Sequence, residues 1–301
     1  MPKITPKTSA QGFVAKASQT KDLAVTVHRY EAGQVHQTED RLAVEAPLEI
    51  RLCSPGEDER ILSITLRTPG EDDELAIGML YGEGVIVRAD DLLDVSHTGP
   101  AQGTEGLHNR LRVTLRGSSR VPLAELERRG ISHAGCGLCG RTHLSAVHHR
   151  CAQPLAMRLR VPLAAILGLP AQLRALQQQF AISGGVHAAG LFDANGRILS
   201  VREDVGRHNA VDKLIGTQLL SQGLPLNDHG LVLSGRAGFE LIQKAVVAGA
   251  EVVVALGPPS ALAHQLAQDM GLTLLGFASE RRVNCYAHPE RIVGLLPAAG
   301  D

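Results

Sequence analysis

The stretch GLVLSGRAGFELIQKAVVAGAEVVVALGPPSALAHQLAQDMGLTLLGF, residues 230–277, decides the fold class. Its three short apolar runs, "GLVLS", "EVVVAL" and "LTLLGF", alternate with two helix-length segments, "AGFELIQKAVVAG" and "PSALAHQLAQDMG". This alternation is typical of a largely parallel sheet covered by helices. We therefore predict an α/β layer, and we expect a ligand at the turns that follow its strands.

The residues just upstream extend this layer. "GGVHAAGLFD" and "RILSVRED" flank "ANG", and Asn-Gly favours a tight turn with positive φ. A hairpin is therefore expected here, and it makes the sheet mixed. The helix "GRHNAVDKLIGTQLL" follows. We assign residues 154–301 to one α/β domain with a three-layer, mixed-sheet architecture, so that the fold class is α/β (α+β) overall.

The first part of the chain is predicted to be β-rich. Apolar residues alternate at Leu23, Val25 and Val27, and again in "RILSITLRT", which favours half-buried strands. A helix is expected after residue 68, with Thr68 as N-cap, Pro69 at its first position and Glu71 completing a capping box. The predicted segments are a disordered lead-in at 1–22, a β-rich domain at 23–130 and a mobile loop and linker at 131–153.

Composition excludes several classes of protein. The 301 residues carry a formal net charge of −1, so the sequence lacks the excess of basic residues that binds a nucleic-acid backbone. It also has no Trp and few other aromatic residues on which bases could stack. The lysine-containing N-terminus has no apolar signal region, and the most apolar stretch is interrupted by charges and prolines. We expect a cytoplasmic protein that contacts neither membrane nor nucleic acid.

The segment "HAGCGLCGRTHLS", residues 133–145, holds a CxxC pair, Cys136 and Cys139. Such a pair could be half of a zinc knuckle, a dithiol switch or a nucleophile on a mobile arm. A zinc knuckle needs a second pair, and Cys151 with a neighbouring histidine fits no common zinc spacing. The glycines around the pair favour a flexible loop. We therefore predict a thiol nucleophile that visits two places. Cys53 and Cys285 are expected to be small buried hydrophobes.

"ISGGVHAAGL", residues 182–191, places His187 on a strand behind Gly184 and Gly185. Zinc nucleobase deaminases carry His-Ala-Glu in such a position, but Ala189 replaces the Glu that transfers the proton. Deaminase chemistry is therefore excluded, whereas a similar fold is not. The glycines allow a ligand to approach the backbone closely.

A dense polar cluster follows in "REDVGRHNAVDKLIG", residues 202–216. His208 and Asp212 lie four residues apart on one helix face, so Asp212 could orient the imidazole. The segment combines acidic and basic residues with a His and an Asn. This composition is more typical of a site that recognises an anion or the edge of a base than of a solvent-exposed helix N-terminus. We expect the cluster to line a ligand pocket: Asp204, Arg207, His208, Asn209 and Asp212.

Two strand-to-helix turns and the end of the last inner strand complete this pocket. Ser234, Gly235 and Arg236 precede a helix N-terminus, where backbone N–H groups favour phosphate. "GPPS" follows the next strand, and the last inner strand ends in "GFASERR". Neither a Walker A pattern nor GxGxxG occurs. A large phosphorylated, nucleotide-like ligand is expected.

At this point the sequence resembles the FdhD family, the accessory sulfurtransferases of formate dehydrogenase. The resemblance covers nearly the whole chain after about residue 40, and "DVGRHNAVDK" in order with CGxCG is highly specific. It implies that a cysteine desulfurase loads persulfide sulfur on the CxxC loop. The sulfur then passes to the molybdenum bis-guanine-dinucleotide cofactor, which enters formate dehydrogenase. It also implies a C-terminal domain similar to the cytidine deaminase fold and a homodimer.

The resemblance assigns roles to individual residues. By this resemblance, Cys136 is the persulfide carrier and Cys139 is its partner. The segment that binds the cofactor in the family corresponds here to Phe277, Ala278, Ser279, Glu280, Arg281 and Arg282. The family usually has Arg where this chain has Ser279, and Arg281 can compensate. GDP-like ligands are expected to mimic one half of the cofactor. The alternative function is a zinc-knuckle binding module without catalysis.

Overall fold

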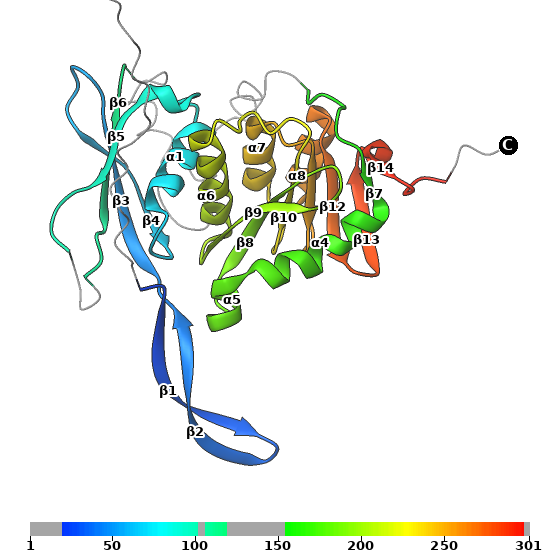
Figure 1. The fold of residues 1–301 in the computed structure, drawn as a ribbon, viewed down its shortest axis with the longest axis horizontal. Helices are drawn as coiled ribbons and strands as arrows, with labels where there is room; N and C mark the ends of the chain where they lie inside the picture. The colour runs from blue at the N-terminus through cyan, green and yellow to red at the C-terminus, as the bar shows by residue number, and fades with distance from the viewer. Residues whose placement is uncertain (1–19, 102–105, 119–153, 298–301) are drawn as a thin grey trace, which may run out of the picture.

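The computed structural model describes residues 20–101, 106–118 and 154–297. Three β-structures organise these residues: a two-stranded arm, a four-stranded sheet and a six-stranded sheet, with a further short pair, β7 and β14. Figure 1 shows the arm projecting from the body, with the four-stranded sheet on one side and the six-stranded sheet on the other. No helix in these ranges is long and apolar enough to cross a membrane.

The first part of the chain forms the arm, the smaller sheet and one main helix. The arm is β1 (Asp22–Glu31) paired antiparallel with β2 (Gln34–Ala43). The sheet has the order β4-β3-β6-β5, in which β3 and β6 are parallel. Its elements are β3 (Ala46–Cys53), β4 (Arg60–Arg67), α1 (Asp72–Gly82), a 3-10 turn (Ala89–Asp91), β5 (Leu92–His97) and β6 (Arg110–Leu115).

The second part forms a three-layer sandwich around the sheet β13-β12-β11-β10-β8-β9. Strands β10, β11 and β12 run parallel, and their neighbours are antiparallel. The elements are β7 (Val161–Pro162), α4 (Leu163–Leu176), α5 (Gln178–Ser183), β8 (His187–Phe192), β9 (Ile198–Asp204), α6 (Arg207–Leu220), β10 (Gly230–Leu233), α7 (Phe239–Ala248), β11 (Val252–Ala255), α8 (Ala261–Met270), β12 (Thr273–Ser279), β13 (Arg282–Ala287), a 3-10 turn (Pro289–Arg291) and β14 (Ile292–Val293).

Side-chain alternation explains the three layers. Leu231 and Leu233 on β10 belong to the core shared with α6, α7 and α8, whereas Val232 between them packs with α4. Successive strand residues point to opposite faces, so an apolar strand can be covered by helices on both sides. The predicted α/β layer and its mixed sheet are confirmed. The likeness to the cytidine deaminase fold stays a prediction.

The predicted hairpin is also confirmed, with a longer connection than Asn-Gly alone suggests. β8 and β9 are joined by residues 193–197, and Gly196 has φ of 72°, while Asn195 has no positive φ. The Asp193 side chain accepts hydrogen bonds from the N–H groups of Asn195 and Arg197. Asp193 therefore stabilises the turn.

The two parts of the molecule meet where α1 packs on α6. A Cβ at Gly78 would lie 1.9 Å from the Asp212 carbonyl oxygen, and a Cβ at Gly216 would lie 1.9 Å from that of Glu74. Each helix therefore presents a glycine to the other's backbone. Leu219 of α6 completes the core between α1 and the four-stranded sheet.

The predicted start of α1 is wrong. The helix begins at Asp72, and its N-cap is Glu71 with φ of 53° and no side-chain cap. The Thr68 side chain instead accepts a hydrogen bond from the Val205 N–H, and its carbonyl accepts one from Lys213. Contact with the second part of the molecule outweighs the local capping preference. The predicted lead-in also ends earlier than expected, since Asp22 already belongs to β1.

Candidate functional site

The candidate site lies at the edge where the parallel strands end. The Gly257 N–H donates to the Gly235 carbonyl at 3.0 Å, and the Phe277 N–H donates to the Gly257 carbonyl at 3.1 Å. These bonds connect the segments after β10 and β11 with the end of β12. The three predicted segments, at 234–236, 257–260 and 277–282, are therefore brought together, as the parallel topology requires.

His187 belongs to the same edge. A Cβ on Gly235 would lie 3.3 Å from the His187 ring, so a larger residue there would require the imidazole to shift by a few tenths of an ångström. His187 opens β8 and is paired with Asp204 at the end of β9. The Ser234 hydroxyl oxygen accepts a hydrogen bond from the Ala188 N–H at 2.8 Å, which ties the loop to the base of β8.

Phe277 has an unusual backbone at this edge. Its φ of 52° lies in the left-handed region, which branched and bulky residues rarely adopt, and it coincides with an irregularity in the β12–β13 pairing. The Arg282 guanidinium lies 5.6 Å from the centre of the Phe277 ring. Such strain is concentrated at binding sites. An aromatic face and a guanidinium are thus held side by side at the strand end.

His208 lies behind this edge as a neutral imidazole. Burial lowers its pKa to about 3, and the positive charge of Arg207 contributes. Its Nε2 lies 3.2 Å from Glu240 Oε2, and because the ring is neutral this contact is not an ion pair. Burial also lowers the pKa of His187, again with a contribution from Arg207. Both imidazoles are therefore neutral at pH 7, while Arg207 keeps its charge.

The prediction that Asp212 orients His208 is wrong. Asp212 pairs with Lys244 at 2.6 Å instead, and its carbonyl lies against Gly78 of α1. Burial raises the pKa of Asp212 to about 6, although Lys244 opposes that shift. Glu240 and Lys244, which contact His208 and Asp212, were not among the predicted site residues. Their i,i+4 spacing in α7 was the available signal.

Asp204 and Asn209 are saturated by neighbours within the protein. Asp204 accepts hydrogen bonds from the N–H groups of Thr68 and Gly206 and from the Asn209 amide, and it pairs with Lys213 at 2.8 Å. The Asn209 amide also donates to the Leu66 carbonyl. Both side chains are buried and do not face solvent, as expected. Their contacts, however, connect the two parts of the molecule. Contact of the predicted cluster with a ligand stays a prediction.

The predicted nucleophiles, Cys136 and Cys139, lie outside the described residues, as do Cys151 and the domain boundary predicted at 131–153. In the ranges that the structure covers, no three His, Cys, Asp or Glu side chains gather as a metal ligand set. Burial raises the pKa of Cys285 to about 11, which makes this half-buried thiol a poor nucleophile at pH 7.

Comparison with known proteins places the chain in a family. The model of the FdhD/NarQ family matches residues 43–293. The chain belongs to this family. It is 43% identical over 278 residues to the sulfur carrier protein FdhD of Streptomyces coelicolor, covering 91% of this chain and 96% of that protein. It is 37% identical to the protein of the same name from Saccharolobus solfataricus, covering 90% and 100%.

A solved structure shares the fold. A crystal structure described as a candidate formate dehydrogenase accessory protein from Desulfotalea psychrophila superposes with a TM-score of 0.67 at 23% identity. The match covers 91% of this chain and 100% of that one. The two proteins therefore share the same fold.

Proposed function

We propose that this protein is a sulfur carrier that serves formate dehydrogenase maturation. Cys136 receives sulfane sulfur from a cysteine desulfurase, and the protein passes it to the molybdenum bis-guanine-dinucleotide cofactor as substrate. The supporting observation is 37–43% identity, over about 90% of the chain, to proteins named as sulfur carriers. The chain has the CxxC thiols that such chemistry requires. We further propose that it acts as a homodimer.

The proposed transfer is balanced without an additional oxidant. The Cys136 thiolate attacks the terminal sulfur of the desulfurase persulfide and forms a new S–S bond to it. The desulfurase cysteine leaves as a thiolate, and Cys136 becomes a persulfide. The Cys139 thiolate then attacks Cys136 Sγ. A Cys136–Cys139 disulfide forms, and the terminal sulfur leaves with its electron pair as sulfide for the metal. A cellular dithiol reduces the disulfide before the next cycle.

The edge at the strand ends supports binding of a dinucleotide substrate. Exposed arginines from its separate segments, Arg236, Arg281 and Arg282, supply charge for phosphates, and neutral His187 offers a hydrogen-bond group beside them. Phe277 offers an aromatic face for a base. The Ser279 hydroxyl donates a hydrogen bond to the Arg282 carbonyl and so stabilises the turn between β12 and β13. At the position where the family usually has Arg, this chain therefore has a residue with a structural role.

Mass spectrometry tests the carrier assignment. The protein is incubated with a cysteine desulfurase and cysteine, and the peptide with Cys136 and Cys139 is examined for one added sulfur atom. We expect Cys136→Ala to abolish this adduct and cofactor sulfuration, with an unchanged circular dichroism spectrum. Cys285→Ser is the matched control and should keep both. Wild-type rates in Cys136→Ala would refute the assignment. A stoichiometric zinc ion held by Cys136 and Cys139 would support the binding-module alternative instead.

A further inference from the structure

The arm formed by β1 and β2 leaves an apolar stripe partly uncovered, with Val25 and Val27 half-buried. Leu23, Val25 and Val27 alternate on β1 and so share one face, and Leu42 lies opposite Leu23 on β2. Leu23 and Leu42 are 50% and 51% exposed. Figure 1 shows the arm standing away from both sheets, with α5 close to its base. An isolated two-stranded ribbon is only marginally stable in water, so this face requires a cover.

The tip of the arm carries the most exposed large apolar pair of the described residues. Tyr30 and Val35 are 72% and 66% exposed, and they face each other across the two strands. A tyrosine ring of this kind is a frequent interface anchor. Nothing in the arm itself covers the pair.

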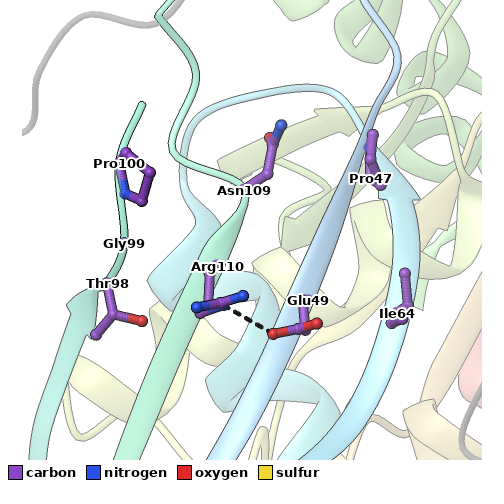
Figure 2. A pocket seen from close by; sticks show the side chains of 8 residues that line it. All are labelled: Pro47, Glu49, Ile64, Thr98, Gly99, Pro100, Asn109 and Arg110. Carbon is purple, nitrogen blue, oxygen red and sulfur yellow. Dashed lines mark hydrogen bonds and ion pairs between the residues drawn. The ribbon is translucent and has the colours of Figure 1, made fainter. Parts of the chain in front are cut away.

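A cavity of about 210 Å³ lies on the outer face of the four-stranded sheet (Figure 2). Pro47, Ile64 and Pro100 give it apolar walls, and Glu49 pairs with Arg110 beside them at 2.9 Å. Thr98 lines it too, and in the described part of the chain its buried Oγ1 has no hydrogen-bond partner. Apolar walls, a guanidinium and an unpaired hydroxyl suit a phenol ring.

The position of the cavity relates it to the arm. Pro47 is only four residues beyond Ala43, the last residue of β2, so the cavity lies near the base of the arm. Ten-residue strands reach about 34 Å. If two arms lie antiparallel about a two-fold axis, the tip of each reaches the base of the other. We propose that a second copy of this chain covers the arm, with Tyr30 and Val35, which lie on the face of the ribbon opposite Leu23 and Leu42, in the partner's cavity.

Charge favours this arrangement. The arm has more carboxylates than guanidinium groups: Asp22, Glu31, Glu39 and Asp40 against Arg29 and Arg41. The outer sheet face around the cavity has the opposite balance, with Arg51, Arg110 and Arg112 against Glu49 and Glu59. Arg110 and Arg112 are 46% and 41% exposed and can meet the acidic arm. Complementary charge of this kind orients partners.

This inference rests on the homodimer within the proposed function and names its interface. One face of the arm covers only about 340 Å², from a length of ~34 Å and a width of ~10 Å, well below the ~800 Å² per partner of a standard interface. The dimer should therefore dissociate on dilution. Sedimentation velocity of the full chain over a concentration series measures this equilibrium.

Two interface variants and a control test the surface. Tyr30→Asp with Val35→Asp, and separately Ile64→Asp in the cavity wall, should raise the dimer dissociation constant at least roughly thirtyfold. Leu262→Asp is the control, because this leucine is 40% exposed on α8, outside the interface. Circular dichroism establishes that each variant is folded. A monomeric wild type would refute the homodimer, whereas a dimer that both variants leave intact would refute the arm interface.

Cross-linking distinguishes contact of the arm with a second copy from contact of the arm with its own chain. A photoreactive benzoylphenylalanine replaces Tyr30, and ¹⁴N- and ¹⁵N-labelled proteins are mixed before irradiation. We expect cross-links from residue 30 to peptides around Pro47, Ile64 or Arg110, with mixed isotope labels. Cross-links within one label only would show that the arm closes on its own chain, and would overturn the proposal.

Discussion

Asp204 is a buried carboxylate whose contacts all come from the protein itself. Lys213, also fully buried, pairs with it at 2.8 Å and donates to the Thr68 carbonyl. Asp204→Asn removes the negative charge and leaves the buried ammonium group with only the more distant, partly exposed Glu71, 3.7 Å away, as a counter-charge. We expect a loss of about 3–5 kcal/mol in the free energy of unfolding, measured by urea denaturation.

Asp40→Asn is the matched control for that change. Asp40 pairs with Arg29 at 3.5 Å on the arm, where both side chains are about half exposed. Solvent screens such a pair, so its loss should cost about 1 kcal/mol at most. Equal effects of the two substitutions would contradict the structural role that the contacts assign to Asp204.

His208 should make the protein sensitive to acid. Its pKa falls from 6.5 to about 3 on folding, chiefly because it is buried. The unfolded chain therefore binds a proton below pH 6.5 that the folded protein accepts only near pH 3, so stability decreases as the pH falls through this window. Each pKa unit corresponds to about 1.4 kcal/mol.

His208→Gln keeps a polar side chain beside Glu240 and cannot titrate. Its acid unfolding midpoint, followed by circular dichroism, should lie at lower pH than that of the wild type. His28→Gln, on the exposed arm, is the control and should leave the midpoint unchanged. The comparison isolates His208 from Asp212, whose raised pKa acts in the opposite direction between about pH 4 and 6. Identical midpoints in all three proteins would contradict the assignment.

Among the elements, α1 and α6 form the closest contact between the two parts of the molecule. Gly78→Ala should be strongly destabilising, by about 3 kcal/mol or more, because its Cβ would overlap the Asp212 carbonyl at 1.9 Å. Gly82→Ala in the same helix meets nothing nearer than Lys244 at 3.7 Å, so helix propensity should make it neutral or stabilising. Urea midpoints of the two variants compare them directly. Similar midpoints would mean that the helices separate easily.

The elements also show what sequence patterns can predict. Apolar runs placed β10, β11 and β12 correctly, because strands covered on both faces are continuously apolar. The start of α1 was wrong, because Thr68 is used by Val205, 137 residues away along the chain. The alternation of Leu23, Val25 and Val27 predicted a buried face, but in the single chain Leu23 is exposed and the two valines are only half-buried. Local patterns identify a face but not what covers it.

At the scale of the whole molecule, topology determined which candidate site residues meet. The turns after β10 and β11 and the end of β12 share one edge because their strands are parallel, which the sequence predicted. The i,i+4 spacing of Glu240 and Lys244 predicts that they share a face of α7, but it does not predict that this face contacts His208 and Asp212. Packing between distant segments, and not spacing along the chain, decides such pairs.

The same edge supports a prediction on nucleotide binding. Arg282 lies at this edge beside Phe277, whereas Arg197 lies in the β8–β9 turn at the opposite end of the sheet. A hydrogen bond to a charged group contributes about 1.5–3 kcal/mol, so Arg282→Ala should weaken GDP binding roughly ten- to a hundredfold. Arg197→Ala should leave it unchanged. Calorimetry with GDP and ADP measures both affinity and base preference. Equal losses of GDP affinity in the two variants would place the nucleotide elsewhere. Equal affinity of the wild type for GDP and ADP would contradict guanine recognition.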